Sequence, residues 1–170
     1  RAGFVPRCVY QDISLPVPPE GLAATCPPAG RVRPAVSADT ARMAAVEMAV
    51  SGIRRDSDYE HFIRNASGYW RVLVCDGPDG ELDGFLVSGP GMLGPGVARS
   101  EPVAAALIWS ELDRWRSRSP VVLVPAECTG LVRQLYAWGG RNCELHFAQV
   151  KGDCPPFRGV TMPSFLPETG

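Results

Sequence analysis

The residue types that most often carry catalysis are few in this chain and widely spaced. Six cysteines are scattered without a C-x-x-C pair, and the two histidines, His61 and His146, lie far apart in the sequence. A structural zinc site usually draws its ligands from closely spaced pairs, so we expect no metal. Lys151 is the only lysine, which leaves little room for lysine catalysis.

Four residues stand out as candidates for a general base or a nucleophile. Glu60, Glu127 and His61 are each candidates for a general base, and the unperturbed pKa of histidine suits that role. Each of the three also fits the plainer role of a surface or capping residue. Cys128 precedes an expected helix, whose N-terminus can lower a thiol pKa, but no histidine lies near it in the sequence.

Charge and composition indicate a globular domain and argue against a nucleic-acid or membrane binder. The chain has 170 residues, of which 45% are hydrophobic and 21% charged, as in one globular domain. Its 17 basic and 18 acidic residues give a net charge of -1. Nucleic-acid and polybasic membrane binders need an excess of cations, so we expect neither partner. No apolar run approaches the roughly 18 residues of a membrane span, and the scattered cysteines predict a cytoplasmic protein with free thiols.

The first thirty residues differ from the rest. Residues 8–15 are expected to form a strand, and proline clusters at 16–19 and 27–28 follow. Prolines this close together continue neither a helix nor a central strand, so residues 19–30 are expected to form a linker. The strand before them has no local partner. We therefore expect it to belong to something upstream or to be shared with a neighbour.

From residue 31 the pattern predicts a mixed α/β sheet with the order β-α-α-β-β-β-α-β-α-β-β. Ser57 and Glu60 have capping-box spacing at the start of a helix. The apolar run at 121–124 lies between prolines, which favours a strand buried on both faces, as in a parallel pair. Strands are expected at 32–36, 70–75, 82–88, 92–98, 121–124, 142–151 and 160–165, and helices after Ser37 and Ser57 and at 101–116 and 131–138.

This order and two short motifs resemble the GNAT superfamily of N-acetyltransferases over about residues 31–170. In that superfamily a strand is followed by R/Q-x-x-G-x-G/A, whose backbone N–H groups open a helix and hold the pyrophosphate of acetyl-CoA. Here Arg99 and Ala104 match the first and last positions. Pro102 replaces the central glycine and removes one N–H donor. Glu101 adds a negative charge where the phosphates would bind.

The second motif is N-x-x-A-x-x-L-Y-x-x-x-G-F, which residues 129–141 match at Leu135, Tyr136 and Gly140. Thr129 stands in place of the asparagine. The resemblance implies that Tyr136 protonates the departing CoA thiolate, and a phenol can act as that acid when it is held near the sulfur. The alternative is that Tyr136 only packs on the sheet.

The resemblance implies an α/β (α+β) fold with a mixed, mostly antiparallel sheet, a central parallel strand pair and about four flanking helices. It also implies acetyl-CoA as co-substrate, with the thioester carbonyl held by backbone N–H groups of the splayed strand. The residues that it assigns are Tyr136 for catalysis and Val97, Ala98, Arg99, Ser100, Val103, Ala104, Ala105 and Thr129 for cofactor binding.

The N-terminal strand is similar to the end of a preceding domain of the same kind, because Gly3-Phe4 leads into it as in the GNAT motif. The resemblance therefore divides the chain into three parts, as in a GNAT subgroup with two domains in tandem. Residues 1–18 would be the tail strand of a preceding domain, 19–30 a proline-rich linker and 31–170 a GNAT-like domain. The partner would be that preceding domain or a second copy in a homodimer.

Two functions remain open from the sequence. The first is an acetyl-CoA-dependent N-acetyltransferase that acts on an amine of a small molecule or a protein. The second is a non-catalytic GNAT-shaped module that has lost cofactor binding and supports or dimerises with a catalytic partner domain. Arg99, Ala104 and Tyr136 favour the enzyme, whereas Pro102 and Thr129 favour the non-catalytic module.

Overall fold

The computed structural model describes residues 3–164, which form one sheet flanked by helices. The strands are β1 (Val5–Ser14), β2 (Val32–Pro34), β3 (Arg71–Asp76), β4 (Leu82–Gly89), β5 (Met92–Ala98), β6 (Val121–Pro125), β7 (Arg141–Val150) and β8 (Val160–Met162). The α-helices are α1 (Thr40–Ser51), α2 (Asp56–Arg64), α3 (Glu101–Leu112) and α4 (Thr129–Ala137).

The strand order is β2-β3-β4-β5-β6-β1-β7, and β8 pairs with β5 off that path. Neighbouring strands are antiparallel except β5 and β6, which run parallel where Met92 pairs with Val121 and Leu93 with Val122. Within residues 3–164 the sheet is therefore mixed, mostly antiparallel and built around one parallel pair. The predicted fold class is confirmed, including the four helices.

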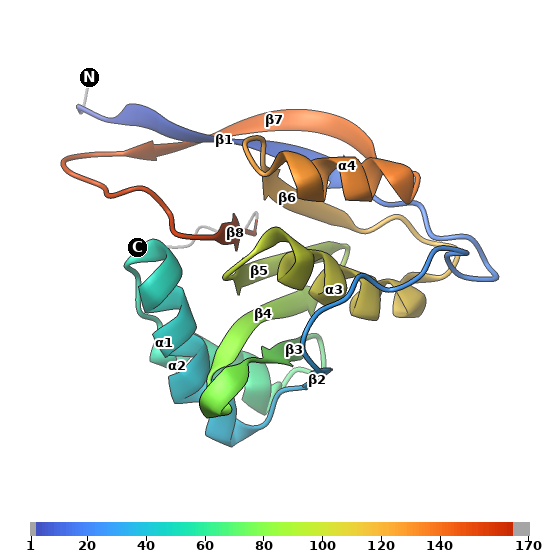
Figure 1. Ribbon diagram of the computed structural model, residues 1–170, viewed down its shortest axis with the longest axis horizontal. Coiled ribbons are helices and arrows are strands. Elements are labelled where there is room, and N and C mark those ends of the chain that lie inside the picture. Colours follow the sequence, from blue (N-terminus) through green and yellow to red (C-terminus); the bar gives the residue numbers. More distant parts are fainter. Residues whose placement is uncertain (1–2, 165–170) are drawn as a thin grey trace.

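Two pairs of helices cover the two faces of the sheet (Figure 1). On one face, Leu107 of α3 and Leu131 of α4 belong to a large buried cluster. On the other face, Met43 of α1 and Tyr59 of α2 pack with Phe85 of β4, and the Tyr59 and Phe85 ring centroids lie 5.0 Å apart. Burial of these apolar side chains holds the helices on the sheet.

β1 is an interior strand of this sheet. Tyr10 pairs with Pro125 of β6 on one side and with His146 of β7 on the other. The strand has no local partner, as expected, but it does have partners within this chain. Its partners lie more than 100 residues away in sequence, where no local pattern could reveal them. That residues 1–18 are the tail strand of a preceding domain stays a prediction.

Both N-terminal helix starts differ slightly from the expected positions. Ser37 begins a 3-10 turn that leads into α1, so it lies inside the turn and does not cap it. α2 begins at Asp56, and Ser57 lies in its first turn. The capping box predicted at Ser57 and Glu60 is therefore wrong. Acidic residues in the first turn of α2 instead favour the positive end of the helix dipole.

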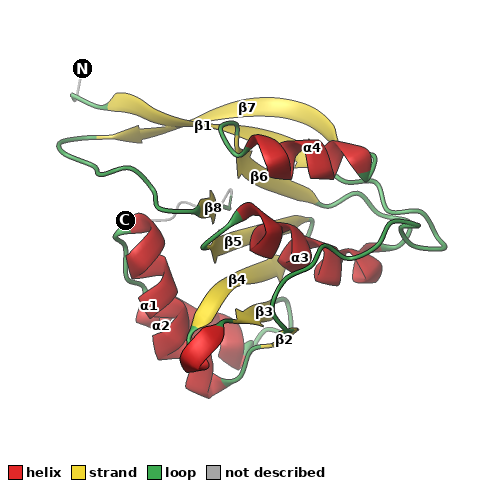
Figure 2. Cartoon of the chain, in the orientation of Figure 1, coloured by secondary structure: helices red, strands yellow, loops and turns green. Residues whose placement is uncertain are grey.

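The predicted linker, residues 19–30, contains no helix or strand and appears in Figure 2 as part of a long loop that leads to β2. The loop is fixed at its start, where Val17 donates its N–H to the carbonyl of Arg118 at 2.9 Å. The last strand was predicted at 160–165; β8 covers Val160–Met162, and Phe165 lies outside the described residues.

All six cysteines are free thiols, as predicted. Among residues 3–164, no helix combines the length and the apolar character needed to cross a membrane.

Candidate functional site

The central feature of the predicted cofactor site is the gap between β5 and β6, and β8 lies in it (Figure 1). The parallel pairing of β5 with β6 extends only through Leu93. Further along β5, Val97 pairs with Thr161 and Ala98 with Val160, both in antiparallel register. β8 also packs against β6. A third strand thus closes the space that the divergence of β5 and β6 would otherwise leave open.

β8 is held in this gap by contacts on several sides. Val160 and Met162 are buried with 1% and 0% exposure and belong to the core beneath α3 and α4. The Tyr10 hydroxyl and the Thr161 hydroxyl share a hydrogen bond of 2.6 Å, which joins β8 to β1. Arg158, just before β8, donates its N–H to the carbonyl of Val50 at 2.8 Å. These contacts make β8 an integral part of the packed sheet.

The N-terminus of α3 faces the N-terminus of α4, and Glu101 lies between them. Its carboxylate accepts a hydrogen bond from the backbone N–H of Leu131. Gly130 permits this approach, because a Cβ there would lie 2.8 Å from a Glu101 carboxylate oxygen. Helix N-termini favour negative charge. The carboxylate of Glu101 therefore binds the N-terminus of α4, beside the α3 N-terminus at which the resemblance predicts the pyrophosphate.

A cleft of about 430 Å³ opens beside Glu101. Pro27 and Pro28 of the linker line it on one side, and Ala105 and Gln134 line it on the other. The lining is mostly apolar, and Pro102, which also lines the cleft, has no N–H to offer an anion. The cleft suits an apolar group better than a diphosphate.

The other predicted cofactor residues lie around this junction without converging on it. Arg99 is exposed and turns toward the β3–β4 connection, where it pairs with Glu81 at 3.0 Å. Ser100 and Thr129 are exposed at the starts of α3 and α4, whereas residues 103–105 are buried in the core. Val97 and Ala98 end β5 just before α3 begins, but the edge of β5 on which they lie pairs with β8.

Tyr136 lies seven residues beyond Thr129 on α4, about 10 Å along the helix axis. It is 42% exposed. Its hydroxyl donates a hydrogen bond to the side-chain oxygen of Gln11 on β1. Its role as an acid stays a prediction, but in this conformation its hydroxyl is directed to β1.

The other candidate proton-transfer and nucleophilic groups lie in settings of two kinds. Glu60, His61 and Glu127 are exposed, in keeping with the plainer role of surface residues. Cys128 is buried, and burial together with the nearby Glu101 carboxylate raises its thiol pKa to about 12. Such a thiol stays protonated at neutral pH and is a poor nucleophile.

These observations decide how well the site fits acetyl-CoA. The edge of β5 that would hold the thioester pairs with β8, and α3, whose N-terminus would hold the diphosphate, begins with the acid Glu101 and with Pro102, which has no N–H donor. As folded, the residues do not fit this cofactor.

A buried charged cluster lies on the opposite face of the sheet, beside a cavity of about 100 Å³ lined by residues of β5 and β8. Glu47 of α1 is 2% exposed and accepts hydrogen bonds from the Arg55 guanidinium, at 3.1 Å from Nε, and from the Tyr59 hydroxyl. Burial and the Glu47 carboxylate raise the pKa of Tyr59 far above its ordinary value. The sequence analysis missed this cluster. Its only local sign is an acid on the apolar helix face of Met43 and Val50.

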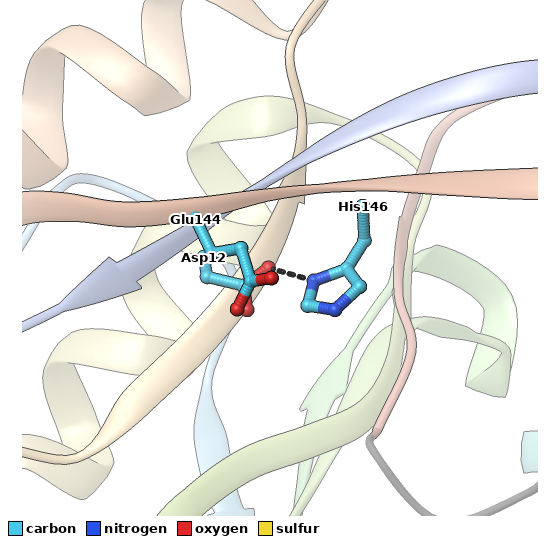
Figure 3. Close-up of side chains that lie close together, drawn as sticks. All are labelled: Asp12, Glu144 and His146. Atoms are coloured by element: carbon cyan, nitrogen blue, oxygen red, sulfur yellow. Dashed lines mark hydrogen bonds and ion pairs between the residues drawn. The ribbon is translucent and has the colours of Figure 1, made fainter.

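Two acids and a histidine meet between β1 and β7 (Figure 3). The buried carboxylate of Asp12 lies 2.8 Å from Nδ1 of His146, and one ligand atom from each of these residues and Glu144 lies within 4.8 Å of the others. These are donor types that can bind a divalent cation. Asp12 and His146 lie 134 residues apart in sequence, so no motif could have predicted their pairing.

We expect the Asp12–His146 pair to make stability depend on pH. The hydrogen bond from Asp12 raises the pKa of His146 above its ordinary value. A raised folded-state pKa stabilises the fold fully below the unfolded pKa of about 6.5 and loses that stabilisation as the pH rises through the folded pKa. The melting-temperature difference between wild type and His146→Gln should therefore be largest near pH 6 and shrink toward pH 9.

The NMR titration of the His146 ring provides the direct measurement. Its midpoint should lie above about 6.5 in the wild type and move down in Asp12→Asn. A wild-type midpoint at or below that of Asp12→Asn would contradict the expected pairing.

The comparisons with known proteins concern the fold. No protein-family model matches the chain, and no curated protein sequence matches it. Among solved structures, a Pyrococcus horikoshii protein superposes with a TM-score of 0.67 at 15% identity, over 93% of this chain and 52% of its own length. A GNAT-family protein of Novosphingobium aromaticivorans superposes with a TM-score of 0.50 at 12% identity, over 86% of this chain and 66% of its own length. Both carry the name putative acetyltransferase. A Drosophila protein superposes with a TM-score of 0.57 at 15% identity, over 85% of this chain and 50% of its own length.

These likenesses show that the chain has the GNAT fold. Identities of 12–15% carry no more than the fold. The chain spans about half of the length of the Pyrococcus and Drosophila proteins and about two thirds of the Novosphingobium protein.

Proposed function

We propose that this chain is a non-catalytic GNAT-fold module, located in the cytoplasm, which supports or pairs with a catalytic partner domain. The observation that carries this proposal is the position of β8, which pairs with β5 at Val97 and Ala98. In the GNAT scheme these two residues would hold the thioester. In this domain β8 fills that place, so the sheet gains a strand pairing where a cofactor would otherwise bind.

The energetics support this reading. Exposing the buried side chains of Val160 and Met162 would cost ~1.5–3 kcal/mol each. A cofactor that has to displace β8 therefore binds on the order of 100-fold to 10,000-fold more weakly than it would to an open site. Glu101 opposes a diphosphate further, because the two groups carry the same charge.

The second candidate is an acetyl-CoA-dependent N-acetyltransferase acting on an amine. One observation favours it, namely the cleft of about 430 Å³ that stays open between the starts of α3 and α4. In this candidate β8 leaves the sheet and the cofactor contacts Val97 to Ser100, Val103 to Ala105 and Thr129. Tyr136 would then have to give up its hydrogen bond to Gln11 to protonate the thiolate.

Thermal unfolding in the presence of acetyl-CoA separates the two candidates. We expect no change in melting temperature at millimolar acetyl-CoA, because β8 pairs with the edge of β5 and Glu101 places a negative charge at the start of α3. A cofactor present at about 100 times its Kd would instead stabilise the fold by roughly 2.7 kcal/mol.

A matched variant tests whether the charge of Glu101 alone prevents binding. Glu101→Gln removes the charge at the helix junction and leaves β8 in place, so it should also show no shift. A clear shift in the wild type would overturn the non-catalytic proposal. In that event Tyr136→Phe should lower kcat without changing the shift, as the enzyme candidate requires.

A further inference from the structure

The outer edge of the sheet is formed by β7, which has ten residues and pairs along one side with β1. No strand within residues 3–164 pairs with its other side. A long exposed edge strand presents a row of unpaired backbone donors and acceptors, which native proteins usually shorten, cover or interrupt with proline. β7 contains no proline, and its residues are mostly exposed.

One face of this edge is apolar. Leu145 and Phe147 are 51% and 57% exposed. Both lie on the α4 face of the sheet, because Leu145 pairs with Gln11, whose side chain bonds the hydroxyl of Tyr136 on α4. Large apolar side chains side by side at an exposed sheet edge indicate a contact surface.

The opposite face of β7 carries charge. Glu144 and His146 lie there beside the Asp12 carboxylate of β1 (Figure 3). The edge therefore has an apolar face and an acid–base face, and Glu144 and His146 are two positions apart in β7. When the strand pairs antiparallel with a second copy of itself about Leu145, an acid and a base at equal distances from Leu145 lie opposite each other.

We propose that a second copy of this chain pairs along β7, antiparallel, about a two-fold axis perpendicular to the sheet, with Leu145 opposite the partner's Leu145. Such an axis keeps each face of the sheet on the same side in both copies. The apolar faces then form one continuous stripe, and the two sheets join into one. The two-fold also makes the interface self-complementary, as homodimers require.

Charge favours this register over the two nearest symmetric ones. With Leu145 at the centre, Glu144 lies opposite the partner's His146 at two equivalent places. A shift of the centre by one residue in either direction would place Glu144 opposite Glu144 or His146 opposite His146. Like charges directly opposite each other in a sheet are destabilising, whereas opposite charges are favourable.

The inference deepens the proposed structural role. It rests on that role only for what the dimer would do. The pairing itself depends on the edge, the apolar face and the charge pattern. Acetyl-CoA binding and dimerisation are measured separately, so the failure of either proposal can be told from the failure of the other.

Sedimentation or light scattering of the purified chain is expected to give a dimer. The double variant Leu145→Lys/Phe147→Lys should raise the dimer dissociation constant at least about 100-fold, because it places four ammonium groups along the apolar stripe. Met48→Lys is the matched control, since Met48 is 52% exposed on α1 and lies away from β7. It should leave the dimer intact, and circular dichroism checks the fold of each variant.

A disulfide tests the register. Residues directly opposite each other in an antiparallel pair have Cα atoms about 4.5–5.5 Å apart, which suits a disulfide. Leu145→Cys, with the exposed or partly exposed Cys26, Cys143 and Cys154 changed to serine, should form a cross-linked dimer on oxidation with diamide. Gln149→Cys should not, because the two copies of that residue would lie about 27 Å apart.

Three results would each overturn the proposal. The first is a wild-type chain that stays monomeric at high micromolar concentration. The second is a lysine double variant that folds and still dimerises like Met48→Lys. The third is a cross-link that forms at residue 149 but not at residue 145, which would place the dimer contact in another register or on another surface.

Discussion

A chain shortened to residues 31–170 is expected to lose its cooperative fold. β1 lies between β6 and β7, so its removal takes a strand from the interior of the sheet. The segment also carries buried apolar side chains, namely Cys8, Tyr10, Ile13, Leu15 and Val17. Full burial of such side chains contributes ~1.5–3 kcal/mol each, and a whole domain is stable by only about 5–15 kcal/mol.

Circular dichroism and heteronuclear NMR of the shortened chain provide the measurement. A peptide of residues 3–18 added in trans should restore the dispersed spectrum, because it can return to the slot between β6 and β7. Removal of residues 1–3 alone is the control, since Gly3 is exposed and precedes β1; its melting temperature should be unchanged. A cooperative transition of wild-type midpoint in the 31–170 chain would refute this account of β1.

The second large effect is expected for Glu47→Ala, which should destabilise the fold by about 3–5 kcal/mol. The substitution removes the carboxylate that accepts hydrogen bonds from Arg55 and Tyr59. The Arg55 side chain is only 15% exposed, so its charge would lose this neutralising partner in a largely dry environment. Removal of one member of a buried ion pair commonly costs this much, because the other charge stays buried.

Chemical denaturation measures this difference. Glu60→Ala is the matched control, because Glu60 is an exposed acid on the neighbouring helix, and it should change the free energy of unfolding by less than about 0.5 kcal/mol. Tyr59→Phe, which removes only one hydroxyl donor, should fall between the two. Equal stabilities of Glu47→Ala and Glu60→Ala would show that the Glu47 cluster contributes nothing to the fold.

The sequence predicted the elements whose pattern is local. The period of the apolar residues placed all four helices, and the proline-bounded run at 121–124 correctly indicated a parallel partner, which is β5. The strand predicted at 92–98 has those bounds in the structure. Each of these features depends on residues within about fifteen positions of one another, where burial and backbone preference act together.

The features that the sequence could not supply are pairings across the whole chain. β1 pairs with strands more than 100 residues away, and Tyr10 bonds Thr161 from the other end of the described chain. Asp12 and His146 meet only because β1 and β7 are neighbours. The chemistry of a side chain does not indicate how far away in sequence its partner lies. These contacts therefore follow from the topology alone.

The sequence indicated two departures from the GNAT pattern at the candidate cofactor site. Pro102 and Glu101 were recognised from the sequence as departures that weaken anion binding, and Glu101 indeed lies at the junction of the two helix starts. The role of β8 was not foreseen. A three-residue strand in a proline-rich segment gives no sign of where it docks, because its position is set by the gap that it fills.

The interior position of β1 has a consequence for how the protein is made. The strand leaves the ribosome well before its partners β6 and β7, which come more than 100 residues later. At about 5–20 residues per second, β1 waits on the order of 5–20 s before its slot exists. Throughout that interval its hydrophobic side chains stay open to solvent and to other nascent chains, and contacts this distant in sequence also slow folding. Nascent copies should therefore depend on chaperones until β6 and β7 have been made.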